Sequence, residues 1–173
     1  MCRSISMRRA TADDIPAIRA MADIVFRKTY ADILSPAQME YMMKWMYSES
    51  SLKEQILSDG KAFYLAEGEG VPCGYVSFEF ESILEDGRKL YHLQKLYVLP
   101  EHQRTGAGSA MLEFVFGYLS SLNPEGCRVE LNVNRHNTAV GFYEKMGLVR
   151  ERQGDFAIGE GFFMNDYIYA IDL

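Results

Sequence analysis

The sequence predicts a mixed α/β (α+β) fold, in which a mixed central sheet is flanked by helices. Short segments with period-two alternation of apolar residues, typical of strands, occur beside longer segments with apolar residues at helical spacing. An apolar strand ending at Val98 also leads through a glycine-containing turn directly into an amphipathic helix. The 173 residues, 48% of them hydrophobic and 24% charged, have no linker and fit a single domain spanning 1–173.

The first third of the chain is predicted to hold one strand and then helices. A capping-box pattern beginning at Thr11 starts the first helix. Ser35 suits the N-cap of the next helix, and Pro36 suits its first position, where the missing N–H of proline costs nothing. The elements expected here are a strand at 5–9 and helices at about 11–28, from 35 onward and at 52–58.

The rest of the chain is predicted to supply most of the sheet. Turns near Gly70 and at Asp86-Gly87 join three strands into an antiparallel run. A helix follows the glycine-containing turn, and another, with Asn137 suited to its N-cap and Gly147 to a left-handed C-cap, precedes the end of the sheet. The expected strands are residues 62–67, 74–81, 90–98, 129–134 and 162–171.

The turn between the strand at 90–98 and the following helix carries the clearest functional pattern. Pro100 stops the strand, and Gln103-Arg104-Thr105-Gly106-Ala107-Gly108 then opens the helix. The first N–H groups of a helix have no intrahelical partner, and the helix dipole adds partial positive charge. The amides from Arg104 to Ser109 are therefore expected to cradle a pyrophosphate, although such a turn can also serve only to join a strand to a helix.

Two other phosphate-binding patterns fit this turn less well. A Walker loop needs Gly-Lys-Ser/Thr after four intervening residues, and the turn has no such lysine. A dinucleotide-binding fingerprint needs a third glycine at position 111, where the chain has Met111. Both alternatives are set aside.

The charge balance points to a cationic partner and a locally bound anion. At a net charge of −6 the molecule as a whole does not attract an anion, so the turn amides and the Arg104 guanidinium must hold it. Glu79 and Glu81 fall on one face of a predicted strand and suit a cationic substrate, although a solvated sheet face or edge is the simpler explanation of either carboxylate alone. The acidic balance, without a basic aromatic patch, argues against nucleic acid.

The cysteines and the hydropathy pattern indicate a cytoplasmic protein with free thiols. Cys2, Cys73 and Cys127 are scattered without the spacing of metal ligands, so no metal is expected. No apolar run approaches the length needed to span a bilayer, and the first residues lack the apolar stretch of a secretory signal. No membrane association is expected.

Two stretches resemble the GNAT superfamily of N-acetyltransferases. QRTGAG after KLYVLPEH is similar to its acetyl-CoA-binding motif, and residues 137–148, NTAVGFYEKMGL, are similar to its later helix. The resemblance implies the GNAT acyl-CoA N-acyltransferase fold and acetyl-CoA as co-substrate. The ending GEGFFMNDYIYAIDL, together with KLYVLPEH, also resembles the bacterial spermidine/spermine N-acetyltransferase subgroup, which implies a small-molecule amine substrate such as a polyamine.

The resemblance also assigns roles to residues that contact the co-substrate. Tyr143 matches the general acid that protonates the departing CoA thiolate. The amide of Leu96 is implied to polarise the acetyl carbonyl, as a small oxyanion site. The backbone of Val98 and the side chain of Asn137 are implied to contact the pantetheine arm. The implied cofactor-binding residues are Leu96, Val98, Gln103, Arg104, Thr105, Gly106, Ala107, Gly108, Ser109 and Asn137.

The proton acceptor is less defined by the resemblance. An alkylammonium with a pKa near 10.4 must lose a proton before it can attack, at a cost of about 4.6 kcal/mol at pH 7. His92 stands where family members often carry a Glu or His that draws the amine proton, usually through water. Asn132 stands where some members place a catalytic glutamate, and an amide cannot act as a base. The remaining candidates for the proton acceptor are His92, Glu79 and ordered water.

Several alternatives stay open from the sequence. A peptide or protein N-terminus, an amino acid or an aminoglycoside can replace the polyamine as acceptor. A non-catalytic module that binds CoA for sensing or assembly is the main alternative to an enzyme. Dimers are common in the superfamily, and the final strand could pair across a two-fold axis to form a homodimer.

Overall fold

A seven-stranded mixed sheet forms the centre of the molecule, in a computed structural model that describes residues 4–173. The strand order is β1-β2-β3-β4-β5-β7-β6. Each neighbouring pair is antiparallel except β4 and β5, which are parallel. The strands are β1 (Ile5–Arg9), β2 (Lys61–Gly68), β3 (Val71–Ile83), β4 (Lys89–Val98), β5 (Cys127–Asn134), β6 (Val149–Gly159) and β7 (Phe162–Asp172).

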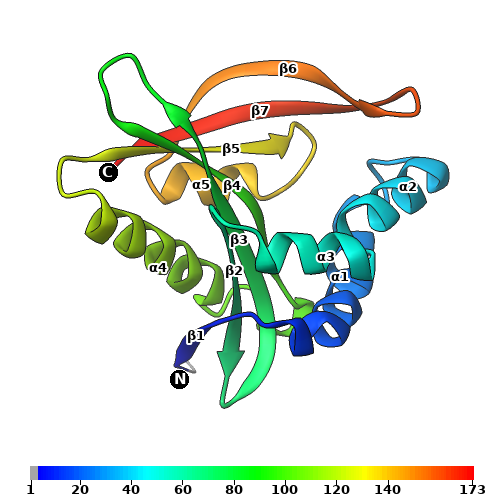
Figure 1. Ribbon diagram of the computed structural model, residues 1–173. Coiled ribbons are helices and arrows are strands. Elements are labelled where there is room, and N and C mark those ends of the chain that lie inside the picture. Colours follow the sequence, from blue (N-terminus) through cyan, green and yellow to red (C-terminus); the bar gives the residue numbers. More distant parts are fainter. Residues whose placement is uncertain (1–3) are drawn as a thin grey trace.

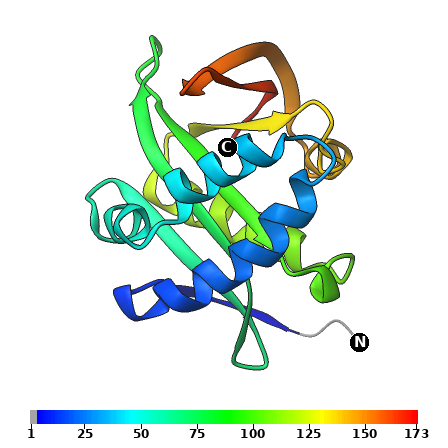
Figure 2. The ribbon, with the colours of Figure 1, turned by 90° about the vertical axis from the view of Figure 1, so that its right-hand side faces the viewer.

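Helices cover both faces of this sheet (Figure 1). Three N-terminal helices lie on one face, as the view turned by 90° also shows (Figure 2), and α4 and α5 lie on the other. The helices are α1 (Ile15–Tyr30), α2 (Pro36–Tyr47), α3 (Glu49–Leu57), α4 (Ala107–Leu122) and α5 (Val140–Lys145), with 3-10 turns η1 (Ala12–Asp14) and η2 (Pro100–His102). This arrangement confirms the predicted mixed α/β fold with helices flanking the sheet.

Each face of the sheet has its own hydrophobic core. The core under α4 and α5 includes Met111, Leu112 and Val115 of α4, each with 0% of its surface exposed. The core under α1, α2 and α3 is rich in aromatic rings, with Phe26, Tyr47 and Tyr75 among its buried members. The tyrosines bring hydroxyl groups into this second core, and these need partners that aliphatic side chains do not.

Local sequence signals explain where most elements begin. The capping box of Thr11 and Asp14 is present, but it opens a single 3-10 turn, and the α-helix begins only at Ile15. Ser35 caps α2 as predicted, because its hydroxyl accepts the Gln38 N–H at 3.2 Å. Gly70 and Gly87, at the two predicted turns, both have positive φ. Glycine adopts that conformation without the steric cost that a Cβ imposes.

Two sequence-based expectations need correction. The strand β6 was not located, because its residues are mostly exposed and charged and give no apolar alternation at this edge of the sheet. Asn137 is not the N-cap of α5, since that helix starts at Val140. The Asn137 carboxamide oxygen instead accepts the Ala139 N–H at 2.9 Å, two residues further on, which forms a turn ahead of the helix.

The cysteines and helix lengths add two observations. Cys73 and Cys127 are buried free thiols, whereas Cys2 lies outside the described residues. Within residues 4–173, no helix is both long and apolar enough to cross a membrane.

Candidate active site

The two parallel strands at the centre of the sheet pair over only part of their length. Residues Lys89–Leu93 of β4 pair with Cys127–Leu131 of β5, and the ladder stops there. Beyond that point β4 stays paired with β3 as far as Val98, and β5 stays paired with β7 as far as Asn134. The two strands therefore present unpaired edges to each other after Leu93, and we call this feature the strand divergence.

Backbone donors of β4 point into the strand divergence. The Leu99 N–H donates to Cys73 O at 2.8 Å, toward β3. Successive residues of a strand turn their N–H groups to opposite edges, so the amides of Val98 and Leu96 point away from β3. No ladder partner meets them there, because β5 has already left the pairing. These two amides can hydrogen-bond an extended ligand lying along the edge.

The turn after β4 is held in a fixed shape by local contacts. The Gln103 side chain donates to Val98 O at 2.9 Å, which ties the turn back to the end of the strand. The Thr105 hydroxyl donates to His102 O at 2.6 Å. Arg104 and Gly106 both have left-handed backbones, with φ of 61° and 90°. A left-handed non-glycine residue such as Arg104 costs about 1–2 kcal/mol, so the surrounding contacts must enforce it.

This turn presents unpaired amides at the start of α4. The helix begins at Ala107, and Ala110 N–H donates to Gly106 O at 3.0 Å. The N–H groups of Ala107, Gly108 and Ser109 precede that bond and have no intrahelical partner. They lie at the positive end of a 16-residue helix. The chemistry of these donors fits a pyrophosphate.

Helix α5 packs against this turn and carries Tyr143, which belongs to the same hydrophobic core as Leu96 and Val98. A Cβ placed on Gly108 would lie 3.5 Å from the Phe142 ring, so the two sequence stretches singled out above are in contact. The Tyr143 side chain is buried, with 8% of the residue exposed. Burial, with a smaller contribution from nearby Tyr30, raises the pKa of Tyr143, which therefore holds its proton at neutral pH.

A group of buried tyrosines lies on the opposite side of β4, between the sheet and α1. The hydroxyl groups of Tyr30 and Tyr97 are 3.4 Å apart, and those of Tyr47 and Tyr75 are 2.7 Å apart. Burial raises the pKa of Tyr30, while hydrogen bonds to Tyr97 and Asn137 lower it. Tyr30 therefore links α1 with β4 and with the segment that leads into α5.

His92 lies in an acidic surrounding on the face of the sheet that carries α1 to α3. Its Nδ1 is 3.3 Å from Glu81 Oε2, and in the sheet it pairs with Glu79 of β3 and Glu130 of β5. The Gln94 amide donates to Glu79 Oε1 at 2.7 Å. The structure thus brings together His92, Glu79 and Glu81, all selected from sequence, one residue before the strand divergence opens.

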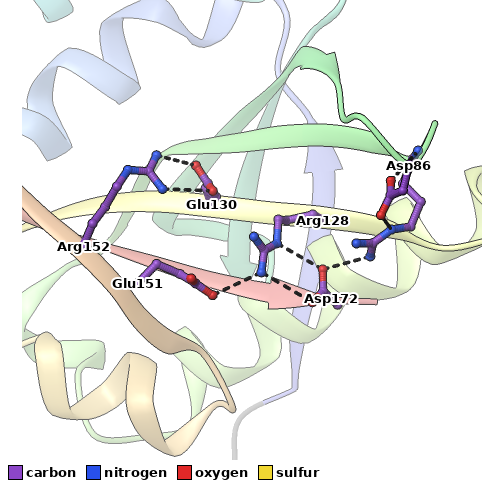
Figure 3. A network of polar contacts seen from close by, with 7 residues as sticks. Asp86, Arg128, Glu130, Glu151, Arg152 and Asp172 are labelled. Atoms are coloured by element: carbon purple, nitrogen blue, oxygen red, sulfur yellow. Dashed lines mark hydrogen bonds and ion pairs between the residues drawn. The ribbon is translucent and has the colours of Figure 1, made fainter.

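Ion pairs neutralise much of the charge on the neighbouring strands (Figure 3). Arg152 of β6 donates through Nη2 to Glu130 Oε2 at 3.1 Å. Arg128 of β5 lies between Glu151 at 3.1 Å and Asp172 at 3.1 Å. Glu130 is therefore a paired carboxylate rather than a free one. Among residues 4–173, no group of three or more His, Cys, Asp or Glu side chains is arranged to hold a metal ion.

Sequence analysis missed three polar residues in this region. Asp166 of β7, Lys95 of β4 and Tyr30 of α1 are all buried. The Lys95 ammonium donates to Gln55 Oε1 at 2.6 Å, and burial lowers its pKa to about 8. A signal for Asp166 was present in the alternation of Met164, Asp166 and Ile168, which places a carboxylate at an inward position of a strand.

Comparison with known proteins gives a family. The family model for the acetyltransferase (GNAT) domain matches residues 30–161. A Mycobacterium tuberculosis protein described as a probable N-acetyltransferase is 26% identical over 143 residues, which is 82% of this chain and 78% of that protein. The family match spans β2 to β6 and so includes the strand divergence, the turn before α4 and α5.

Solved structures share the whole architecture. The PaiA N-acetyltransferase of Thermoplasma acidophilum in complex with coenzyme A has a TM-score of 0.78 and 22% identity, covering 96% of this chain and 98% of that one. Naa50 of Arabidopsis thaliana, in complex with the bisubstrate analogue CoA-Ac-MVNAL, has a TM-score of 0.68 and 19% identity, covering 97% and 98%. At such identities, the likeness establishes the fold.

Proposed function

The chain belongs to the GNAT acetyltransferase domain family, and on that basis we propose that it transfers an acetyl group to a primary amine by direct attack in a ternary complex. It is an N-acetyltransferase, and acetyl-CoA, which supplies an activated acetyl thioester, is its co-substrate. The observation that supports the detailed proposal best is the strand divergence, where the amides of Leu96 and Val98 have no ladder partner. The identity of the acceptor amine and the roles of the side chains are the parts of this function that we propose.

The residues around the strand divergence fit CoA in three places. The amides of Ala107, Gly108 and Ser109, with Gln103, Arg104, Thr105 and Gly106 shaping their turn, would hold the pyrophosphate. The amides of Leu96 and Val98 would meet the acetyl carbonyl and the pantetheine arm. Asn137 would contact that arm from the other side.

Tyr143 is the proposed proton donor to the leaving thiolate. Its buried phenol stays protonated across the neutral range, because burial raises its pKa. A thiol, with a reference pKa of about 8.5, is a stronger acid than a phenol, so acidity alone does not drive the transfer. The Tyr143 hydroxyl group acts by its position, because it can donate its proton to the sulfur as the C–S bond breaks. The same arrangement keeps the donor away from bulk water.

His92 is the proposed route by which an amine proton leaves the site, with water between the two. The Glu81 carboxylate, 3.3 Å from Nδ1, can stabilise the imidazole when it carries the extra proton. Glu81 is exposed and can attract a cation to this face, whereas Glu79 is partly buried and lies 3.9 Å from Lys61 Nζ. They support the interpretation that the acceptor is cationic.

A polyamine is the proposed acceptor, because two carboxylates on one strand suit a molecule with several ammonium groups. A peptide N-terminus is the second candidate, since the Arabidopsis neighbour holds an analogue that combines CoA, an acetyl group and a peptide sequence. A cytoplasmic location, a homodimer and a single domain over 1–173 stay predictions from the sequence.

The test is thiol release from acetyl-CoA with spermidine, spermine, lysine, a short peptide and an aminoglycoside. We expect the wild type to turn over at least one of them. Tyr143→Phe removes only the hydroxyl group and should lower kcat by about 100-fold while the Kd for CoA stays unchanged. Tyr118→Phe, in the aromatic cluster of α4, is the matched control and should keep wild-type kcat. CoA binding without turnover on any acceptor would favour the sensing or assembly module instead.

A further inference from the structure

Asp166 is a buried carboxylate with an unsatisfied oxygen. The residue has 4% of its surface exposed. Its Oδ2 accepts the Asn132 amide at 3.3 Å, whereas Oδ1 has no hydrogen-bond partner among residues 4–173. An unpartnered, buried carboxylate oxygen costs free energy, so a folded protein retains one only where something else depends on it. Asp166 is separate from the residues proposed above for acetyl transfer.

The position of Asp166 relates it to the strand divergence. In the β5–β7 ladder it pairs with Asn134, and Asn132 lies two residues earlier on the same face of β5. Both asparagines lie beyond Leu131, where β5 has left β4. Asn132 is exposed, whereas Asp166 is buried. The Asn132 hydrogen bond is long for its type, so a competing donor can displace the amide at small cost.

Tyr30 of α1 relates Asp166 to the residues of β4. Tyr30 bonds Tyr97 and Asn137, and the Asp166 charge acts on Tyr30 as well. Tyr143 is likewise influenced electrostatically by Tyr30. Tyr30 thus interacts electrostatically with Asp166 and contacts Tyr97, the residue between Leu96 and Val98 on β4.

Asp166 differs in its partners from the other carboxylates of this face. Glu130 is paired with Arg152, Glu81 lies beside His92, and Glu79 accepts from Gln94. Asp166 has no salt bridge among the described residues. The nearby cation, Arg135, donates instead to Asp155 of β6. Asp166 is therefore the carboxylate whose charge is left for a ligand.

From this geometry we infer that Asp166 binds the ammonium group of the reacting amine and takes its first proton. The inference rests on the proposed acetyl transfer to a primary amine. An N–H bond of the ammonium breaks and an O–H bond forms on Asp166 Oδ1, so an ammonium and a carboxylate become a neutral amine and a carboxylic acid. The nitrogen lone pair is then free to attack the thioester.

The environment of Asp166 suits this proton transfer. Burial raises the pKa of Asp166, while the Asn132 hydrogen bond and the Arg135 charge oppose that shift. The groups that face it are Tyr30 from α1, Asn132 from β5, and Arg135 with its Asp155 partner. A carboxylate that is costly to keep charged accepts a proton more readily than one in water. The same carboxylate selects cationic amines over neutral alcohols.

The experiment compares Asp166→Asn with the wild type, using whichever of spermidine, lysine, a short peptide or an aminoglycoside the wild type acetylates. We expect kcat/KM at pH 7 to fall by about 100-fold while the Kd for CoA changes by less than about twofold. Raising the pH from 7 to 9.5 should narrow the deficit, because bulk water then supplies more of the neutral amine. Asp172→Asn, on the same strand, is the control and should keep wild-type kcat/KM.

Each outcome separates the inference from the function on which it rests. Wild-type kcat/KM in Asp166→Asn overturns the inference alone. A deficit that does not narrow with rising pH shows a structural role and also overturns it. A wild type that acetylates none of the acceptors contradicts the proposed function first, and the inference falls with it.

Discussion

The turn before α4 and the face around Asp166 are built in different ways. The turn consists of contiguous residues from Gln103 to Ser109, and its donors are backbone amides fixed by two left-handed residues. What we call the amine face is the proposed amine-binding set of Tyr30 from α1, His92 from β4, Asn132 from β5 and Asp166 from β7. One region is local and made of backbone, whereas the other is assembled from side chains of four separate elements.

The difference explains why the two regions carry different kinds of information. Backbone amides offer the same chemistry whatever the side chains, so the turn depends mainly on small residues at a fixed spacing. The amine face depends on which side chain stands at each separate position. We therefore expect similar turns in proteins that acetylate different acceptors. The side chains of the amine face should determine which acceptor is used.

The largest expected effect is on the turn. Gly106→Glu places a carboxylate at a φ of 90°, directly beside the amides proposed to hold the pyrophosphate. We expect the Kd for CoA, measured by calorimetry, to rise by about 100-fold or more, through charge repulsion and backbone strain together. Gly106→Ala isolates the strain and should have a smaller effect. Gly117→Glu, within α4 at a position where an added Cβ meets open space, is the control. Unchanged CoA affinity in Gly106→Glu would contradict the proposed cradle.

A smaller effect is expected on the amine face. His92→Gln removes the titrating group but keeps a side chain that can hydrogen-bond Glu81. We expect kcat/KM for the amine to fall by about tenfold, because a relay through water contributes less than direct contact. The Kd for CoA should stay as in the wild type, since His92 precedes the strand divergence. A matching loss of CoA affinity would show that the two regions are not separable.

The smallest effect is on stability. Burial raises the pKa of Asp166, so the folded state binds that proton more tightly than the unfolded state. The protonated form therefore favours folding, and stability is lost as the pH rises from about 3.9, the unfolded value, through the raised folded value. Asp166→Asn should raise Tm at pH 7 by about 2–4 °C, equivalent to about 1 kcal/mol, and the gain should vanish below about pH 3.9.

Asp172→Asn is the opposite case in the same melting experiment. Burial of Asp172 is outweighed by hydrogen bonds from Arg88 and Arg128, which lower its pKa. Its charge therefore stabilises the fold above the ordinary pKa of aspartate, and this contribution is lost as the pH falls through the lowered value. Asp172→Asn should lower Tm at pH 7. A fall in Tm for Asp166→Asn as well would show that its carboxylate is satisfied in the fold.

The sequence predicted most of the sheet and little of the amine face, for physical reasons. The β2–β3–β4 run and the Ser35 cap follow from alternation and turn chemistry, which act over a few residues. The edge strand β6 gave no apolar alternation, so it was missed. The pairing of Asn132 with Asp166 spans 34 residues and depends on β7 lying beside β5. No local pattern could reveal that contact.

The short parallel ladder between β4 and β5 also has a mechanical consequence. Among residues 4–173, it is the only strand pairing between the antiparallel strands β1–β4 and the antiparallel strands β5–β7. Five paired residues per strand thus carry all of the backbone pairing between the two halves of the sheet. A molecule that bonds to β4 in the strand divergence adds backbone contacts beyond the end of that ladder. The enzyme should therefore be least flexible with its co-substrate bound. The hydrogen exchange of the β4 amides should be slowed in that state alone.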